Sequence, residues 1–309
     1  MPRSIRKNIA CRILHDWQKM KKFIILIPVF NDWESLTKLL AEINENIKDY
    51  ENINFECMVV NDASTVSQPK ITKPKNIKSL RVLNMSENRG HARCNAFGIR
   101  YIFKNEEFDN LILMDGDGED RPIEIKSLIN KVIDEPNNSV VAKRIKRSEG
   151  FFFQLLYQFH KILTYIFTGK NINFGNYSCL TKKDVEKLYN KASLWSSYSG
   201  TIKKNLKEFS EINSVRGLRY FGPSQMSLLK LLTHSFSIIA VFKYQVFLRS
   251  TFMIIILAYL NSHLGNVSIF FQIIIVLFNL IIFIVSLREK DSELKNSQDN
   301  LGTINIITH

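Results

Sequence analysis

The sequence predicts an α/β protein in which a mostly parallel sheet is flanked by helices and followed by two apolar helices. Between residues 23 and 133, short apolar runs alternate with stretches of helical periodicity, as in parallel sheets with crossover helices. Several runs end in polar residues, which parallel strands would bring to one edge of the sheet. Between residues 246 and 287, two long apolar segments have the composition of membrane-seeking helices.

The apolar runs are the predicted strands, at residues 23–28, 55–60, 80–85 and 111–114. A helix is expected at residues 36–47, where apolar residues recur three or four positions apart. Two more are expected, one opened by residues 86–90 and running to about residue 103, and one from residue 122 to about residue 133. Pro122 suits the first turn of the last of these helices. The polar edge where the strands end is therefore the predicted site.

The loop after the fourth strand, residues 115–120 (DGDGED), holds four carboxylates among six residues. Such a cluster repels itself unless a cation or solvent neutralises it. In an extended chain Asp115, Asp117 and Glu119 point to the same side, so their oxygens could converge on one Mg²⁺ or Mn²⁺ ion. A solvated acidic turn is the alternative for an isolated motif of this kind.

Composition narrows the class of protein less than the motifs do. The 309 residues carry a net charge of +13, which suits nucleic acid, anionic lipid or phosphorylated substrates equally well. No recognised nucleic-acid-binding motif is present, so we expect no nucleic-acid partner. The four cysteines are widely spaced, which argues against structural zinc and favours free thiols in a reducing compartment.

Four short motifs follow one another along the chain: residues 28–32 (PVFND), 61–64 (NDAS), 88–90 (NRG) and 115–117 (DGD). In this order they resemble the family 2 glycosyltransferases of the GT-A fold, over about residues 23–235. The segment DGDGEDRP further resembles the DADLQDPP segment of polyprenyl-phosphate glycosyltransferases, which include dolichyl-phosphate mannose synthase. The resemblance implies a nucleotide-sugar-binding GT-A fold and an inverting transfer that depends on Mg²⁺ or Mn²⁺.

The resemblance also implies the roles of individual residues. Those expected to bind the nucleotide-sugar are Pro28, Phe30, Asn31, Asp62, Asn88, Arg89, Gly90, Asp115 and Gly116. Those expected to hold the metal are Asp115, Asp117 and Glu119, and the expected catalytic set is Asp117, Glu119, Asp120 and Arg144. The sequence departs from the family pattern at Glu119, where the family has Gln, and at Gly118 and Arg121, which alter the shape of the loop.

The acceptor decides the mechanism. A sugar hydroxyl needs a general base, whereas a lipid phosphate is already anionic and needs cations to hold it. Residues 143–147 (KRIKR) are basic and follow a short apolar run; they predict either a phosphate clamp or a solvated loop. By resemblance, Arg144, Arg147, Arg219 and Tyr220 would bind the acceptor phosphate. The QxxRW segment of many polysaccharide-elongating relatives is missing from the sequence, which also favours polyprenyl phosphate.

Membrane contact is expected from four segments. Residues 151–167 are rich in aromatic side chains and predict a helix lying in the membrane plane, with His160 in a packing or interface position. Residues 223–235 resemble a second interface helix. Residues 246–264 and 267–287 predict two spans, the first interrupted by Arg249, which could reach the headgroups. A soluble core is the alternative for these two apolar segments.

The sequence thus divides into a basic leader (1–22), a glycosyltransferase domain (23–235), a transmembrane hairpin (236–288) and a polar cytoplasmic tail (289–309). The leader is expected to be an interfacial helix or a frayed end. Lys and Arg flank the outer ends of the hairpin, so the protein is expected to be multi-pass with its catalytic domain on the cytoplasmic face. Homo-oligomerisation is left open.

The predicted function is transfer of a sugar from a nucleotide-sugar to undecaprenyl or dolichyl phosphate at the bilayer. Two alternatives remain at this stage. One is a family 2 enzyme that acts on a hydroxyl of a glycolipid or O-antigen precursor, with Glu119 or Asp120 as the base. The other is a catalytically weak membrane scaffold, which the departures in the acidic loop keep open.

Overall fold

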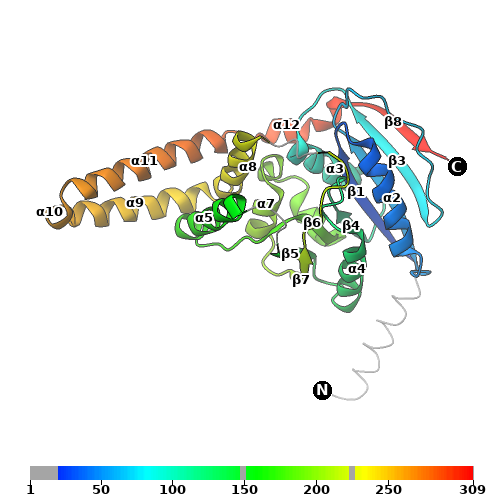
Figure 1. Ribbon diagram of the computed structural model, residues 1–309, viewed down its shortest axis with the longest axis horizontal. Helices are drawn as coiled ribbons and strands as arrows, with labels where there is room; N and C mark the ends of the chain where they lie inside the picture. Colours follow the sequence, from blue (N-terminus) through cyan, green and yellow to red (C-terminus); the bar gives the residue numbers. More distant parts are fainter. Residues whose placement is uncertain (1–19, 147–150, 223–226, 309) are drawn as a thin grey trace, which may run out of the picture.

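The computed structural model describes residues 20–146, 151–222 and 227–308. An α/β domain carries a long helical arm that projects from one side (Figure 1). The described residues of the domain form one eight-stranded sheet, in the order β7-β5-β6-β4-β1-β2-β3-β8. The strands are β1 (Lys21–Val29), β2 (Ile53–Asn61), β3 (Ile77–Met85), β4 (Asn110–Leu113), β5 (Val140–Lys146), β6 (Phe174–Thr181), β7 (Ser210–Val215) and β8 (Leu301–Ile307).

The first half of the sheet has the predicted architecture. Strands β4, β1, β2 and β3 are mutually parallel neighbours. Alternate residues of β1 enter opposite cores: Ile24 and Leu26 pack with α3, while Phe23, Ile25 and Ile27 pack with α2 and α4. Because both faces are covered, these strands are continuously apolar. The helices are α2 (Trp33–Ile47), α3 (His91–Asn105) and α4 (Ile125–Asp134), the last preceded by the short helix η1 (Pro122–Glu124).

The second half of the sheet is mixed. Strand β6 is antiparallel to both β4 and β5, and β7 is parallel to β5. Residues 174–178 lie in β6. The segment that follows forms α6 (Lys182–Leu188), η2 (Ala192–Trp195) and α7 (Tyr198–Asn205), for which no prediction was made. The predicted mostly parallel sheet flanked by helices is confirmed.

The C-terminal segment corrects the expectation of a polar tail. Residues beyond the arm form α12 (Asp291–Lys295), the short helix η3 (Ser297–Asn300) and β8, which pairs antiparallel with the edge strand β3. Leu294 is fully buried in the core that contains α3. The segment therefore completes the domain. At the other end, residues 1–19 of the predicted leader lie outside the described part of the chain, and Lys21 and Lys22 already belong to β1.

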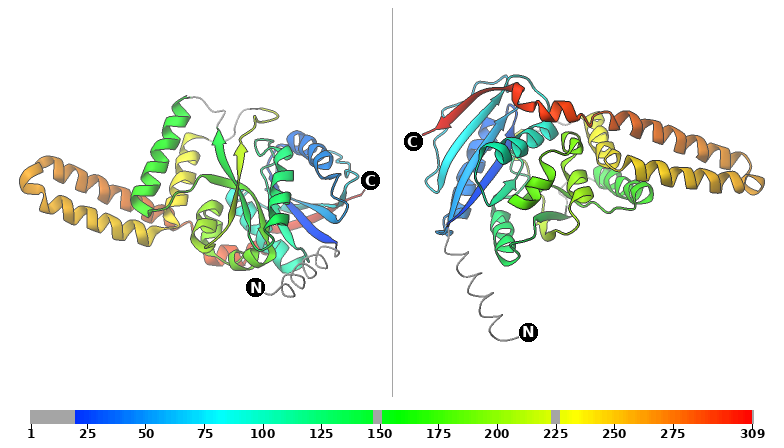
Figure 2. Two further views of the ribbon diagram at one scale, coloured as in Figure 1. Left: turned by 90° about the horizontal axis from the view of Figure 1, so that it is seen from below. Right: turned by 180° about the vertical axis from the view of Figure 1, so that it is seen from behind.

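The arm consists of α9 (Lys243–Tyr259) and α11 (Asn266–Ser286), which lie side by side and are joined at the tip by α10 (Asn261–Leu264) (Figure 1). At its base lie α5 (Phe151–Thr168) and α8 (Leu228–Ala240) (Figure 2). Among the described residues, α11 alone belongs to a helix long and apolar enough to cross a membrane by itself. Helices α8 and α9 meet that criterion only together, as a pair bent by 84°. Of the two predicted spans, the one in α11 therefore meets this criterion alone, whereas the one in α9 meets it only together with α8.

Arg249, which was expected to reach the lipid headgroups, contacts the end of α5. Its Nη1 donates a hydrogen bond to the carbonyl oxygen of Ile166 at 3.1 Å, and its guanidinium lies against Gly169. Ile166 is in the last turn of α5, where unpaired carbonyls favour a cation. Arg249, the charged residue within the apolar sequence of α9, therefore connects the end of α5 to the arm.

Candidate active site

The acidic loop leaves β4 between β1 and β6 and turns at once. A Cβ on Gly116 would lie 2.9 Å from the carbonyl oxygen of Pro28, so the loop can approach β1 only with glycine there. Gly118 has a φ of +87°, which also favours glycine. The expectation that an extended chain would aim Asp115, Asp117 and Glu119 to one side is wrong, because the chain bends within these residues.

Asp120 holds the base of this loop. Its Oδ2 accepts a hydrogen bond from the backbone N–H of Asp115 at 3.0 Å, and only 4% of the residue is exposed. Burial, reinforced by the nearby charge of Asp115, raises the pKa of Asp120 to about 8. An enclosed carboxyl group that faces its own loop is better placed to shape that loop than to reach a substrate hydroxyl.

Two residues that the sequence analysis did not select complete the surroundings of Asp115. His91, the first residue of α3, has its Nε2 3.2 Å from Asp115 Oδ1. Asn176 on β6 has its Nδ2 2.7 Å from His91 Nε2 and 3.2 Å from Asp115 Oδ1. Desolvation opposes charging of both His91 and Asp115, but their mutual attraction outweighs it: the pKa of His91 is raised and that of Asp115 is lowered.

The loop after β7, residues 216–222, folds over the acidic loop. Backbone N–H groups of Gly217 and Tyr220 donate to the carbonyl oxygens of Glu119 and Asp117, at 2.8 and 2.9 Å. The side chain of Arg216 forms an ion pair with Glu119. We call residues 216–222 the arginine loop.

Arg219 bridges two separate parts of the site. Its Nη1 lies 3.0 Å from Asp117 Oδ2, and its Nη2 forms an ion pair with Asp32, which follows β1. Burial and the neighbouring Asp115 nevertheless raise the pKa of Asp117 to about 6. The structure therefore brings Arg219 to the carboxylates of the predicted metal site.

Tyr220 fills the space beside Gly118. Its ring lies where a side chain on residue 118 would have to go. Its hydroxyl donates a hydrogen bond to Glu42 Oε2 on α2 at 2.7 Å, and the Lys38 ammonium lies 4.4 Å from the ring centroid. Gly118, where the sequence departs from the family pattern, thus leaves the space that the Tyr220 ring of the arginine loop occupies.

The predicted metal ligands can be compared with these contacts. Three carboxylates within five residues are the hard oxygen donors that Mg²⁺ and Mn²⁺ prefer, and three basic side chains already neutralise them in this conformation. Among the described residues, no three His, Cys, Asp or Glu side chains are arranged around one point that could hold a metal ion. The donor set fits a divalent cation in its chemistry, and the arginine loop would have to release Asp117 for that cation to bind.

The remaining predicted donor-site residues lie on neighbouring loops of the same edge. Asp62 is 3% exposed, and its carboxylate accepts hydrogen bonds from the backbone N–H groups of Arg89 and Gly90, both at 2.8 Å. Asn88 Nδ2 donates to the carbonyl oxygen of Asp62 at 3.1 Å. The motifs NDAS and NRG are therefore tied together by Asp62.

Asn31 connects the loop after β1 to the loop that contains the motif NDAS. Its Oδ1 accepts from the backbone N–H groups of Thr65 and Val66 at 2.8 and 3.1 Å, and its own N–H donates to Ser64 Oγ at 2.9 Å. Pro28 is buried within β1, whereas Phe30 is 38% exposed at the rim. The predicted donor-site motifs thus meet at the carboxyl edge of the parallel strands.

On the other side of Asp115 lies Arg144 of β5. Its guanidinium packs against Gly175 of β6, next to Asn176, and its charge acts on both Asp115 and Asp120. Arg144 thus lies near enough to act on the acidic loop, and its role at the acceptor phosphate stays a prediction. Arg147 lies outside the described residues.

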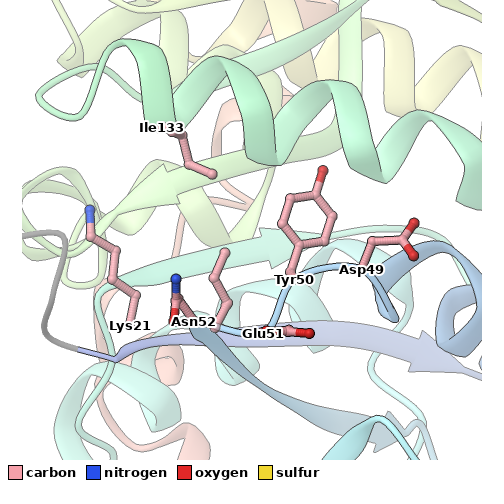
Figure 3. A pocket seen from close by; sticks show the side chains of 7 residues that line it. Lys21, Asp49, Tyr50, Glu51, Asn52 and Ile133 are labelled. Carbon is pink, nitrogen blue, oxygen red and sulfur yellow. The ribbon is translucent and has the colours of Figure 1, made fainter.

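A pocket at the amino edge of the sheet is separate from this site (Figure 3). It is lined by Lys21 and Ile53 at the starts of β1 and β2 and by Tyr50, whose hydroxyl donates to Asn130 Oδ1 at 2.7 Å. The acidic loop follows β4, which is parallel to β1, and so lies at the opposite, carboxyl edge of the sheet. The pocket therefore contains none of the predicted functional residues.

The chain is similar to known proteins in both sequence and fold. The family described as glycosyl transferase family 2 matches residues 24–204. The chain is 25% identical over 221 residues to the undecaprenyl-phosphate 4-deoxy-4-formamido-L-arabinose transferase of Proteus mirabilis, covering 70% of this chain and 66% of that relative. It is 26% identical to the enzyme of the same name from Serratia proteamaculans, covering 72% of this chain and 68% of the relative.

Among solved structures, the chain resembles glucosyl-3-phosphoglycerate synthase from Mycobacterium tuberculosis, with a TM-score of 0.51 and 13% identity over 75% of this chain and 82% of the other. That protein was crystallised with Mn²⁺, UDP-glucose and phosphoglyceric acid. At this identity the likeness bears on the fold alone, and it confirms the expected GT-A-like architecture.

Proposed function

Because the chain belongs to glycosyl transferase family 2, we propose that it transfers a sugar from a nucleotide-sugar to polyprenyl phosphate, such as undecaprenyl phosphate. The observation that carries this proposal is the likeness, over about seven tenths of the chain, to transferases named for undecaprenyl phosphate. The family match, residues 24–204, includes the acidic loop, Arg144 and α5.

The donor would lie along the carboxyl edge of the parallel strands. The loops held together by Asp62 and Asn31 are proposed to take the nucleotide, and His91 at the start of α3 would face its diphosphate. A divalent cation on Asp115 and Asp117 would offset the charge that develops on the leaving diphosphate. Arg216 and Arg219, released from Glu119 and Asp117, would then contact the same phosphates.

The acceptor would enter from the side of the arm. A phosphomonoester carries its own negative charge near neutral pH and needs no strong base. The enclosure of Asp120 agrees with this, because that carboxyl group faces the backbone of Asp115. Arg144 is the described residue proposed to neutralise the incoming phosphate. Transfer to such an acceptor would join its oxygen to the sugar carbon as the bond to the nucleotide diphosphate breaks.

The arm is proposed to hold the protein in a bilayer. Only 17% of the most apolar stretch of α11 is buried, so most of its apolar surface has no covering within the described chain. Helices α5 and α8 also expose large apolar side chains, among them Phe159, Ile162 and Leu229. Lys and Arg flank the outer ends of the arm and none lies at its tip, so the domain is assigned to the cytoplasmic face.

The direct test is an acceptor assay with the full-length protein. Protein in detergent or nanodiscs receives Mg²⁺ or Mn²⁺, a panel of labelled nucleotide-sugars and undecaprenyl phosphate, followed by extraction into organic solvent. We expect label in the lipid phase that is released by mild acid, as from a glycosyl phosphate. The same panel with chelator should give none.

The other outcomes separate the alternatives. Donor binding without lipid label, but with transfer to a glycolipid hydroxyl, would replace the polyprenyl-phosphate assignment with a hydroxyl acceptor. Absence of donor binding throughout the panel would favour a membrane scaffold. Full activity in the presence of chelator would remove the metal from the mechanism.

A further inference from the structure

We propose that His160 and His234, together with Arg144, form a site for the phosphate group of a lipid phosphomonoester. This inference rests on the proposed function and names residues of the acceptor site beyond the arginines expected from the sequence. Both histidines come from helices at the base of the arm, α5 and α8. Neither belongs to the motifs shared with the glycosyltransferase family.

His234 faces the domain from α8. Ile238 lies one turn later on the same side of this helix and enters the core that contains α3. His234 itself is only partly exposed and lies just beyond that core. Its imidazole is within electrostatic range of His91, Arg144, His160 and Asp115. An apolar helix thus brings one of its few polar side chains to the predicted site.

His160 occupies the corresponding position on α5. Thr164 and Thr168, one and two turns later, are each 2% exposed, so His160 lies on the inward stripe of the helix. Its neighbours Phe159 and Ile162 are more than half exposed on the other faces. Helix α5 packs against α8, and the views in Figures 1 and 2 agree on this. The two histidines therefore approach each other from adjacent helices.

The hydrogen-bond donors in this group of side chains indicate which ligand the site would bind. His91, Arg144, His160 and His234 come from four different elements and supply N–H donors, and the carboxylate of Asp115 also acts on His234. Asp115 already has His91 and Asn176 as partners. Such a group of donors suits a phosphate dianion, which accepts several charge-assisted hydrogen bonds at once.

The surroundings indicate that the phosphate comes from a lipid. Side chains next to the histidines are apolar and exposed, including Leu155 and Phe159 on α5 and Leu232 on α8. They would contact the hydrocarbon chain while the phosphate reaches inward. The donor diphosphate has a separate set of cations in the arginine loop, on Asp117 and Glu119. The proposed site therefore lies on the acceptor side of Asp115.

The test measures binding of undecaprenyl phosphate to the full-length protein in nanodiscs, without donor. His234→Ala and His160→Ala should each weaken binding about tenfold, the effect of losing one charge-assisted hydrogen bond. His263→Ala is the matched control, because His263 is exposed at the tip of the arm. His234→Gln, which keeps an N–H donor, should retain part of the affinity. Melting temperatures close to that of the unchanged protein establish that the variants fold.

Three comparisons make the proposal falsifiable. Unchanged lipid affinity in both folded alanine variants would overturn it, as would equal binding of undecaprenol and undecaprenyl phosphate to the unchanged protein. In transfer assays, the alanine variants should have a higher KM for the lipid and a KM for the nucleotide-sugar within about twofold of that of the unchanged protein. The reverse pattern would place the histidines in the nucleotide-sugar site and overturn the proposal. Competition by inorganic phosphate at concentrations equal to the lipid would show a free-phosphate site instead.

The proposed function can fail separately. If the unchanged protein binds undecaprenyl phosphate through the histidines but transfers no sugar to it, the phosphate site stands and the acceptor reaction does not.

Discussion

At the scale of single residues, the contact between Gly118 and Tyr220 ties the acidic loop to the arginine loop. Tyr220 reaches across Gly118 to Glu42 of α2, so the two loops and the helix hold one another in place. A side chain at residue 118 would displace the ring and would also strain a backbone with φ of +87°. The glycine is therefore required by the position of the arginine loop.

Gly118→Ala should consequently lower both stability and transfer activity. Strain at positive φ and displacement of the ring together predict a loss of about 2–4 kcal/mol in the free energy of unfolding. Gly222→Ala is the control, since Gly222 has a φ of +65° but no atom of the described residues within 4 Å of an added Cβ. Denaturant unfolding of the two variants measures the difference. Equal losses would mean that contact with Tyr220 contributes nothing.

Asp117→Asn tests the acidic loop itself. The amide keeps the size of the side chain but loses the charge that is proposed to hold the metal and that attracts Arg219. We expect transfer to fall at least about 100-fold, while membrane insertion and melting temperature change little. Labelled product per unit time is the measurement. Full activity in this variant would exclude Asp117 from metal binding.

The sequence predicted only some of the residues that surround Asp115. The motifs near the ends of the parallel strands identified Asp62, Asp115 and Asp117, because such ends meet at one edge. His91 and Asn176 were not selected, although His91 directly follows the motif NRG. Asn176 lies 61 positions from Asp115 and reaches it through an antiparallel strand order that local sequence does not specify.

At the scale of elements, the segment from η3 to β8 supports the predicted donor loops. Backbone and side chain of Ser86 both donate to the carbonyl oxygen of Asn300, at 2.8 and 3.1 Å. Asn300 Nδ2 in turn donates to the carbonyl oxygen of Glu87 at 3.1 Å. The loop that leads into the motif NRG is therefore held from the C-terminal segment.

Asn300→Ala should loosen this loop. Loss of one hydrogen bond of this kind predicts an increase of roughly threefold in the KM for the nucleotide-sugar, with the KM for the lipid acceptor unchanged. Asp299→Ala serves as the neighbouring control, because Asp299 is exposed. Steady-state kinetics with each substrate varied in turn provides the measurement. If both KM values changed together, the effect would be on general stability.

The strands of the parallel half were predictable from their apolar runs, but β8 was not. Buried strands leave a continuous apolar signal, whereas β8 is an edge strand with mostly exposed side chains and polar residues at Thr303 and Asn305. Its partner β3 lies more than 200 positions earlier in the chain. A short edge strand with so distant a partner has no local pattern that distinguishes it from a polar tail.

At the scale of the whole molecule, the proposed orientation can be tested by labelling. Ser262→Cys places a thiol at the exposed tip of the arm, and Ser67→Cys places one on the exposed surface of the domain. The described native cysteines, Cys57, Cys94 and Cys179, are buried and give little background. In intact cells a membrane-impermeant maleimide should label residue 262 but not residue 67 until the membrane is permeabilised. Labelling of residue 67 in intact cells would reverse the orientation.

Strand β8 also limits how the chain can pass through a bilayer. It pairs with β3, so the residues before and after the arm belong to one sheet and must lie on the same side of any membrane. The number of crossings between them is then even. If α11 crosses the membrane, a second crossing is needed to keep the number even. Helix α9, which lies alongside α11, is the segment that could provide it. A single crossing is therefore incompatible with a sheet that contains both β3 and β8, so an arm that enters a bilayer would do so as a pair.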